Sequence, residues 1–524
     1  MRKHIATTAG IPVLCAMLAL SAYGQAAGDY RSAGNGDWSA ASTWEEFDGT
    51  NWVAAASAPG GEETITIDGT DTVSVDVLVS VAGVIRVTET GVLEVGSGAL
   101  EFANGSTYEH ARDAGEVPLA TWANGSTFLL TGTVQDAPGN RNQDYYNVTI
   151  NTPNLGRNRD LSLNGVTIGG DVHIIDTGGS RWQLTSASGG ESAIITILGD
   201  VIMDAGTFAV QGTGNALTTF EVHHHGDIIV NGGNFSVARG SQGEGSGTTT
   251  WFLYGGNLSM TDVTTQNSNP TPGNAKLVFA GNGTQQLSFQ NVTYGGGQVH
   301  FEVSDSTTLE ITSDLGINGQ LVNRGEIVPQ GALTFLDGSV YEHARNEGSV
   351  PDATWNEGST ARITGVTSDA PDNRGQDYHN LVLDTPDLSS NRDMDLGGHT
   401  IGGNIEVLAS GGSRWRLVGG DSAEVTIMGD LIVRNASFET QGTSNPSAVV
   451  VNHFGDVDVD GGEFSVSRGS QGSGTGSTIW YLHGGDFRMA NARTRNSNPT
   501  DGNARFVFAG DSVQTLTLGE GNTI

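Results

Sequence analysis

Two copies of one charged phrase hold the residues best suited to acid–base chemistry. Residues 108–122 read YEHARDAGEVPLATW, and residues 341–355 read YEHARNEGSVPDATW, 233 positions later. Polysaccharide lyases and hydrolases move protons with carboxylates and basic groups of this kind. The candidate catalytic residues are Glu109, His110 and Arg112 in the first copy and Glu342, His343 and Arg345 in the second.

The duplication of these residues favours a structural role over a catalytic one. Alternate side chains of an extended strand face opposite sides, so Tyr108 and His110 share one face while Glu109 takes the other. One active site per molecule is the usual need, yet every candidate recurs. The next best set is also duplicated, as Arg159 and Asp160 and as Arg392 and Asp393. We therefore expect a repeated structural coil and no turnover of common polysaccharides; a carbohydrate-active enzyme is the alternative.

A run of three histidines at 223–225 is the most obvious candidate for binding a metal. His224 shares the parity of the apolar residues around it and is expected to point inward. His223 and His225 then point outward, two residues apart, a spacing that zinc could use. The second copy reads NHF at 452–454, so only the inward histidine, His453, is kept. This pattern indicates a core histidine beside two surface ones.

Three carboxylates at alternate positions form the second candidate for an ion. Asp456, Asp458 and Asp460 line the outward face of one expected strand, and calcium prefers several oxygen ligands. The first copy has an aspartate, an isoleucine and an asparagine at the matching positions of 227–231. We expect a solvated polar face and no cofactor, with calcium as the one ion that the pattern allows.

Six paired tryptophans are the candidates for binding a ligand. An exposed tryptophan face can stack on a sugar, whereas a buried one packs the core. Both interpretations stay open from the sequence. The residues are Trp122, Trp182 and Trp251 in the first copy and Trp355, Trp415 and Trp480 in the second.

Composition narrows the class of protein. The net charge of the 524 residues is −34, and lysine occurs only at Lys3 and Lys276. An acidic chain without a basic patch argues against nucleic acid as a partner. Residues 1–26 have a basic start, an apolar run and small residues, which predicts a cleaved signal peptide that removes Cys15. No later stretch is apolar for long enough to cross a membrane, so we expect an exported protein, extracellular or on the outer cell surface, with the periplasm also allowed.

A shorter repeat inside each long copy predicts the fold. A glycine followed by Asp or Asn and an alternating apolar run recurs at Asp171, Asp200, Asp227 and Asn257, spaced 29, 27 and 30 residues. Short strands on such a period indicate a solenoid whose stacked turns share one core. We expect an all-β parallel β-helix of roughly 20 coils, each adding about 4.8 Å. An array of β-sandwich domains is the alternative.

The repeat also divides the chain. The expected parts are a signal peptide (1–26), an N-terminal β segment or cap (27–91), a first repeat (92–324) and an incomplete second repeat (325–524). The second repeat stops where the first continues for about 30 more residues, which leaves no polar capping unit over Leu516, Leu518 and Ile524. On these grounds we expect the sequence to be a fragment of a longer protein.

The stretch GDWSAASTWEEFDGTNWVAAASAPGGEETITIDGTDTVSVD, together with the YEHAR phrase, VFAGNGTQQLSF and GDVIMDAGTFAV, resembles large secreted Bacteroidetes surface proteins. The resemblance covers most of the chain after the signal. It implies a glycine-rich β-helical, adhesin-like protein associated with type IX secretion, although the C-terminal sorting domain of that route is not seen here. The expected function is a secreted or cell-surface structural protein that contacts extracellular glycans or other cell-surface components.

Overall fold

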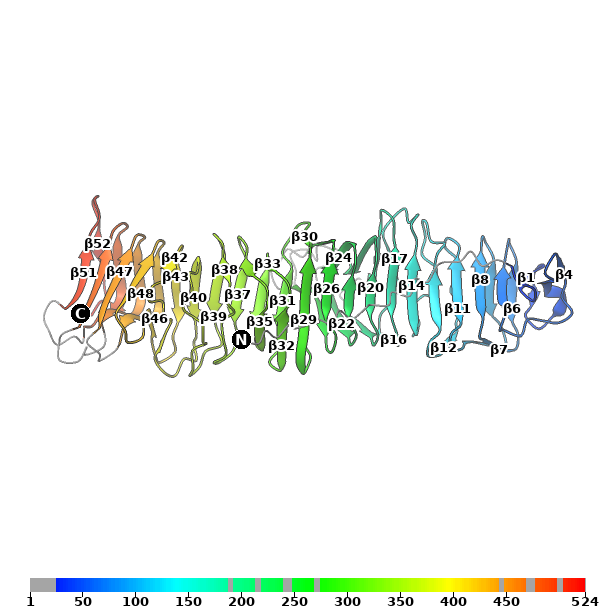
Figure 1. Ribbon diagram of the computed structural model, residues 1–524, viewed down its shortest axis with the longest axis horizontal. Coiled ribbons are helices and arrows are strands. Elements are labelled where there is room, and N and C mark those ends of the chain that lie inside the picture. The colour runs from blue at the N-terminus through cyan, green and yellow to red at the C-terminus, as the bar shows by residue number, and fades with distance from the viewer. Residues whose placement is uncertain are drawn as a thin grey trace, which may run out of the picture.

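The chain folds into a long rod of stacked coils, with β1–β4 at one end and β51 and β52 at the other (Figure 1). This computed structural model describes residues 25–186, 192–212, 218–238, 247–267, 274–442, 447–467, 476–496 and 503–523. Over these ranges there is no α-helix, and the one helical segment is the 3-10 turn η1 (Ala41–Thr43). The signal peptide predicted from the sequence, with Cys15, lies outside the described residues up to position 24.

Two long sheets carry most of the strands. The first long sheet has 15 strands in the spatial order β35 (Glu326–Pro329), β32 (Thr307–Ile311), β29 (Gly283–Gln290), β26 (Leu258–Thr261), β23 (Ile228–Val230), β20 (Val201–Met203), β17 (Val172–Asp176), β14 (Asn147–Asn151), β13 (Thr127–Leu130), β11 (Thr107–Ala111), β8 (Val84–Thr88), β5 (Thr64–Ile67), β1 (Tyr30–Ser32), β3 (Trp44–Phe47) and β4 (Trp52–Ala54). The second long sheet has 17 strands, β16 (Val166–Ile168), β19 (Ala193–Ile197), β22 (Thr219–His224), β25 (Thr248–Leu253), β28 (Ala275–Phe279), β31 (His300–Val303), β34 (Gln320–Asn323), β37 (Val340–His343), β39 (Thr360–Ile363), β40 (Asn380–Asp384), β41 (Arg392–Asp393), β43 (Ile405–Ala409), β44 (Trp415–Arg416), β46 (Leu431–Gln441), β48 (Val457–Ser467), β50 (Phe487–Arg493) and β52 (Leu516–Leu518).

Five smaller sheets complete the coils. A six-stranded sheet contains β15 (Arg159–Asp160), β18 (Arg181–Gln183), β21 (Thr207–Gln211), β24 (Gly233–Ala238), β27 (Val263–Thr265) and β30 (Thr293–Tyr294). A five-stranded sheet contains β42 (Thr400–Ile401), β45 (Ala423–Ile427), β47 (Ala448–His453), β49 (Ser477–Leu482) and β51 (Ala504–Phe508). Three sheets of three strands are β12 (Thr121–Trp122), β10 (Ala99–Phe102) and β7 (Leu78–Val81); β2 (Gly36–Asp37), β6 (Thr72–Val75) and β9 (Val92–Val95); and β33 (Leu315–Ile317), β36 (Leu333–Phe335) and β38 (Thr354–Trp355).

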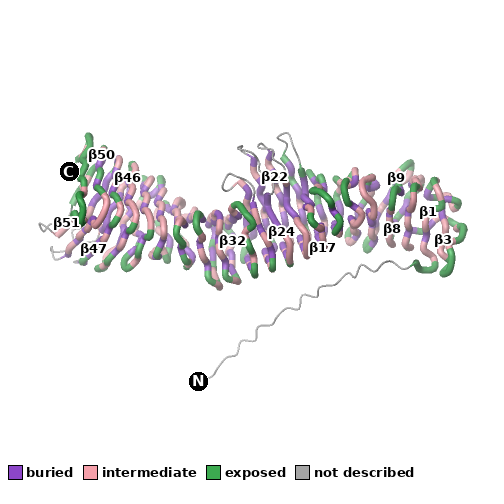
Figure 2. The backbone as a smooth tube through the Cα atoms, turned by 90° about the horizontal axis from the view of Figure 1, so that it is seen from above, coloured by how far each residue is buried: buried purple, intermediate pink, exposed green. Residues whose placement is uncertain are grey.

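The parallel pairing of strands from successive coils confirms the β-helix. In β22, for example, Phe220, Val222 and His224 are buried while the residues between them are not, as the alternating sequence predicts. Buried residues follow the inner side of the coils along the whole rod (Figure 2). The two long sheets overlap between β16 and β35 and pair strands of successive coils in parallel, which excludes an array of separate β-sandwiches.

The repeated Gly-Asp step has a physical cause at one corner of the coil. The Asp200 carboxylate accepts a hydrogen bond from the backbone N–H of Asp227 in the next coil at 2.8 Å, and Asp171 does the same for Asp200. The glycine before each aspartate is required because the coils approach closely there. A Cβ on Gly226 would lie 2.2 Å from the carbonyl oxygen of Gly199, closer than atoms can approach. The spacing of the Gly-Asp step along the sequence therefore equals the number of residues in one coil.

The second long repeat is displaced around the rod by one face. Strands β11, β13, β14 and β17 of the first copy belong to the first long sheet, whereas their counterparts β37, β39, β40 and β43 belong to the second. Likewise β22 and β25 lie in the second long sheet, and their counterparts β47 and β49 lie in the five-stranded sheet. The coils between the copies are shorter, since Leu309 pairs with Ile327 only 18 residues later. Equivalent residues of the two copies thus face different sides of the rod.

Both ends of the rod differ from the regular coils. At the N-terminal end, β1 pairs antiparallel with β3, which pairs antiparallel with β4, so the first long sheet ends in a hairpin. Parallel stacking already begins where β1 and β8 flank β5, ahead of the boundary expected at residue 91. At the other end Leu516 and Leu518 of β52 are half exposed, and Ile524 is outside the described residues.

Candidate functional site

The two histidines of the repeated phrase hold the turn that follows their strand. His110 Nδ1 lies 3.1 Å from the Tyr108 hydroxyl, and its Nε2 lies 2.7 Å from the carbonyl oxygen of Ala114. His343 makes the same two contacts, at 3.1 Å to Tyr341 and 2.8 Å to the carbonyl oxygen of Glu347. Nε2–H therefore donates to a carbonyl while Nδ1 accepts from a hydroxyl.

Burial keeps both histidines neutral and out of reach of a substrate. It is the main cause that lowers the pKa of His110 to about 4, and it has the same effect on His343. A general base must reach the proton that it abstracts, and neither ring has an exposed edge. The two histidines therefore stabilise the coil, which agrees with the structural interpretation of the repeated phrase.

The neighbouring carboxylates are engaged between coils. Glu109 is only 4% exposed, lies 3.2 Å from Arg86 Nε and accepts a 2.7 Å hydrogen bond from the Thr131 hydroxyl. Glu342 accepts from Gln320 at 2.9 Å and from Thr364 at 3.0 Å. The second candidate set is likewise paired in both copies, as Arg141–Asp160, Arg159–Asp136, Arg374–Asp393 and Arg392–Asp369.

The six paired tryptophans all lie in the core, where no sugar can stack on them. Trp182 and Trp415 donate their indole N–H groups to Thr152 and Thr385, each at 2.9 Å. Trp122 and Trp355 are bonded to glutamine side chains in the same way, and Trp251 and Trp480 are fully buried. A stacking role needs an exposed ring face, so the core-packing interpretation describes Trp122, Trp182, Trp251, Trp355, Trp415 and Trp480.

The three histidines at 223–225 divide between the two faces as their parity predicts. His224 is buried and its Nε2 lies 2.8 Å from the carbonyl oxygen of Gly199; His453 repeats this contact with Gly429. His223 points outward, with Nδ1 3.0 Å from the Tyr254 hydroxyl and Nε2 3.3 Å from Glu221. No group of three or more potential metal ligands occurs in the part of the chain that the structure describes.

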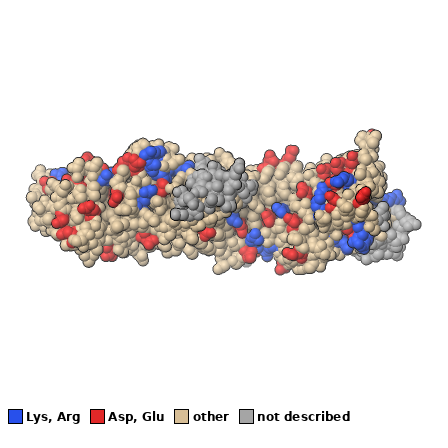
Figure 3. Space-filling model, turned by 180° about the vertical axis from the view of Figure 1, so that it is seen from behind, with Lys and Arg blue, Asp and Glu red and all other residues tan. Residues whose placement is uncertain are grey.

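The three aspartates 456, 458 and 460 each bond to a neighbouring coil. Asp456 accepts from the backbone N–H of Asp486 at 2.7 Å. Asp458 lies between Arg434 (2.6 Å) and Arg488 (2.9 Å), and Asp460 accepts from Asn491 at 3.2 Å. These contacts give each carboxylate a structural partner. Acidic and arginine side chains are interspersed on the face seen in Figure 3, where they do not gather into a basic patch.

A stack of outward-facing rings is the most distinctive surface of the first copy. The first ladder consists of His223, His225, Phe252 and Tyr254, whose strands β22 and β25 are paired in register. The His223 and Phe252 centroids are 5.4 Å apart, those of His223 and Tyr254 are 5.6 Å apart, and those of His225 and Tyr254 are 5.3 Å apart. The rings are nearly parallel, at 13° to 26° to each other.

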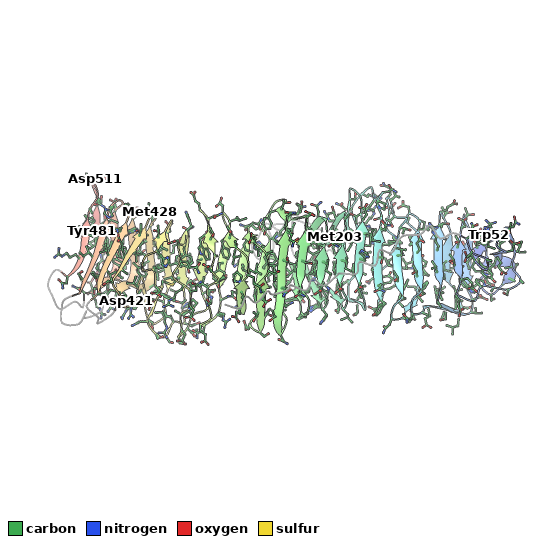
Figure 4. The ribbon with its side chains drawn as sticks, in the orientation of Figure 1. Trp52, Met203, Asp421, Met428, Tyr481 and Asp511 are labelled. Carbon is green, nitrogen blue, oxygen red and sulfur yellow. The ribbon has the colours of Figure 1, made fainter. Side chains whose placement is uncertain are left out.

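The second copy rebuilds the stack with different residues. The second ladder consists of Asn452, Phe454, Tyr481 and His483, at the matching positions of β47 and β49. The His483 ring stacks on Phe454, with centroids 4.9 Å apart, and on Tyr481, with centroids 5.9 Å apart. Asn452 accepts a 3.0 Å hydrogen bond from His483. Only the arrangement is shared, so what is kept is a row of flat side chains rather than a particular residue. Tyr481 is labelled near the C-terminal end in Figure 4.

In the coil that follows each ladder, the residue in register with the last ring is an alanine. Ala280 follows Tyr254 in the next coil, as the bond from its N–H to the Leu253 carbonyl shows (2.8 Å). Ala509 follows His483 through the equivalent bond to Leu482, also 2.8 Å. A methyl group covers little of a ring, so one face of Tyr254 and one of His483 stay open. These open faces can stack on a flat ligand, with the Tyr254 hydroxyl or a histidine nitrogen beside it as a hydrogen-bonding group.

Sequence reasoning missed these rings because it followed the tryptophans. In TTTWFLYGG and STIWYLHGG, the tryptophan has inward parity and the next ring has outward parity. The signal that could have found Phe252, Tyr254, Tyr481 and His483 is an aromatic residue at an outward position in both copies.

Comparison with known proteins identifies no relative. No family model matches the chain, no curated protein is similar to it, and no solved structure matches its fold. The described residues contain no helix of sufficient length and hydrophobicity to cross a membrane.

Proposed function

We propose that the protein is a secreted or cell-surface β-helical rod, structural and adhesin-like, that contacts extracellular glycans through its two ring ladders. The observation that carries this proposal is the duplicated open ring face at Tyr254 and His483. Stacking between coils accounts for the contacts of the outward rings, but not for the face left open on the last ring of each ladder. Their recurrence with different residues therefore supports a binding role.

Export is the second part of the proposal. It rests on the basic start and apolar run of residues 1–26 and on the resemblance of the chain to large secreted Bacteroidetes surface proteins. Glycans are the proposed partners because an open ring face with polar groups beside it suits the mixed apolar and hydroxylated surface of a sugar. No metal or cofactor enters the proposal, and the candidate acids and bases are all used in packing.

Binding to immobilised glycans tests the proposal. We expect Tyr254→Ala or His483→Ala to weaken binding about fivefold each, because one ring contact contributes about 1 kcal/mol. The double variant should lose most of the binding. Leu119→Ala removes an exposed apolar side chain outside the ladders and is the matched control. Wild-type binding by the double variant would contradict the proposal.

The enzyme alternative is tested on the same samples. The wild-type protein is assayed for release of reducing ends or unsaturated sugars from common polysaccharides. If such release occurs and is lost in Glu109→Gln or Glu342→Gln, the protein is an enzyme and the binding proposal is wrong. We expect no such release, because both carboxylates are held by neighbouring coils.

A further inference from the structure

A hollow of about 300 Å³ lies on the outer face of the first long sheet, where the β3–β4 hairpin extends the sheet beyond β1. We name it the hairpin pocket. Trp52, at the start of β4, is labelled at this end of the rod in Figure 4. Past the expected signal peptide, the residues that line the pocket include Tyr30, Arg31, Trp52, Thr66, Asp68 and Arg86.

The hollow follows from the side chains that meet in register across three coils. Arg31 pairs with Thr66, and Thr66 pairs with Arg86, so one short side chain lies between two long ones. The Arg31 guanidinium is fixed by Glu45, to which its Nε donates at 2.7 Å, and by the Trp52 ring, whose centroid is 4.8 Å away. Thr66 therefore lies at the bottom of a slot, and the fixed Arg31 side chain forms one side of that slot.

Polar groups without a protein partner face this slot. Arg86 reaches the Glu109 carboxylate through Nε at 3.2 Å, and no described residue accepts a hydrogen bond from its two terminal nitrogens. Thr64 and Thr66 supply hydroxyls. Asp68 uses Oδ1 for the Thr88 hydroxyl (2.7 Å) and the Gly69 N–H (2.9 Å), which leaves Oδ2 as an acceptor. Donors and acceptors are thus both available around one space.

The charges of the lining select the class of ligand. Arg31 and Arg86 are each paired with a glutamate outside the lining, Glu45 and Glu109. The remaining carboxylates of the lining are those of Asp29, Asp68 and Glu89, so the net charge disfavours an anion. A simple cation would leave the Arg86 donors without an acceptor. A neutral molecule with several hydroxyl groups satisfies both kinds of group, and the partly exposed Trp52 adds an apolar contact.

We propose that the hairpin pocket binds one neutral sugar unit. The volume suits a single small ligand rather than a chain. This site is separate from the ring ladders and does not rest on their role, because it lies on other strands and uses other residues. For a ligand of this size, a dissociation constant on the order of 1 mM is expected.

Trp52 makes the pocket measurable. Of the nine tryptophans, all of which lie within the described residues, eight are buried and Trp52 is not. Quenching of tryptophan fluorescence by acrylamide therefore reports mainly on Trp52. Glucose, galactose, mannose or N-acetylglucosamine should protect this fluorescence in a saturable way, whereas glucuronate should not. The ladder variant Tyr254→Ala/His483→Ala should show the same protection as wild type, so failure of the ladders and failure of the pocket are distinguishable.

A matched pair of substitutions at the bottom of the slot completes the test. Thr66→Leu fills the slot and should weaken sugar binding at least tenfold, while Thr66→Ser keeps the hydroxyl and should bind like wild type. If the leucine variant does not fold, Asp68→Asn, which removes a carboxylate acceptor, should weaken binding severalfold. The proposal is overturned if no neutral sugar protects Trp52, if glucuronate protects it better, or if the folded Thr66→Leu variant, or Asp68→Asn in its place, binds like wild type.

Discussion

Acid should open the coil around His224. Burial is the largest cause that lowers the pKa of His224 to about 4, partly offset by the hydrogen bond to the Gly199 carbonyl. In the unfolded chain the ordinary value of 6.5 applies. The unfolded state therefore binds the proton more readily, and stability that is complete above pH 6.5 is lost as the pH falls toward 4. Between pH 7.5 and pH 5 the loss is roughly 2 kcal/mol.

The same change acts at each buried histidine. His110, His300, His343 and His453 also have their pKa lowered to about 4 by burial. Together the five cost roughly 10 kcal/mol at pH 5, which is comparable to the whole stability of an ordinary domain. We therefore expect marked loss of structure near pH 5.

Native-state hydrogen exchange measures the loss of stability strand by strand. A local measurement is needed because long repeat arrays need not unfold in one step. The quantity to compare is the decrease in the free energy of opening of β22 between pH 7.5 and pH 5. This decrease should be about 2 kcal/mol smaller in His224→Gln than in wild type. His225→Gln, at the exposed neighbour, removes only a smaller cause of the lowered His224 pKa and should keep most of the wild-type pH dependence. Equal pH dependence in wild type and His224→Gln would refute the reasoning.

The Gly-Asp corner and the repeated phrase give three further predictions. Gly226→Ala should destabilise the rod by about 1–3 kcal/mol, because its Cβ meets the Gly199 carbonyl, whereas Gly179→Ala enters open space and should be neutral in thermal unfolding. Burial, and then repulsion from neighbouring aspartates, raises the Asp200 pKa. Asp200→Asn should not destabilise, because an amide oxygen can still accept the hydrogen bond and a charge that is costly there is removed; Asp200→Ala should cost about 1 kcal/mol by the same assay. Tyr108→Phe should cost about 1 kcal/mol, because His110 Nδ1 loses its donor; a neutral result in urea titration would contradict this.

Alternation and period were enough to predict the fold. The parity of FEVHHHGDIIV places His224 inward, and the recurrence of Gly-Asp every 27 to 30 residues gives the coil length. The conclusion that the YEHAR phrase is structural also came from its duplication. These features are local, since each depends on neighbours within one strand or one turn.

The surfaces could not be predicted in this way because they combine residues from different coils. Arg86 meets Glu109 and Thr66 only through the stacking register, and Trp52 reaches Arg31 only because β3 and β4 extend the sheet beyond β1. The ring faces at Tyr254 and His483 are open because of the alanines one coil later. A repeat in the sequence also says nothing about which side of the rod each copy occupies.

The displacement of the second repeat by one face sets how the two ladders are presented to the surroundings. They lie about ten coils apart, roughly 50 Å along the axis, and on sheets that face different directions. A flat surface that touches one ladder therefore leaves the other turned away from it. Two ladders in line would strengthen attachment to a single surface. Under the proposed function, two ladders that face different directions would instead contact separate partners, so that binding through both would cross-link two bodies rather than tighten the hold on one of them.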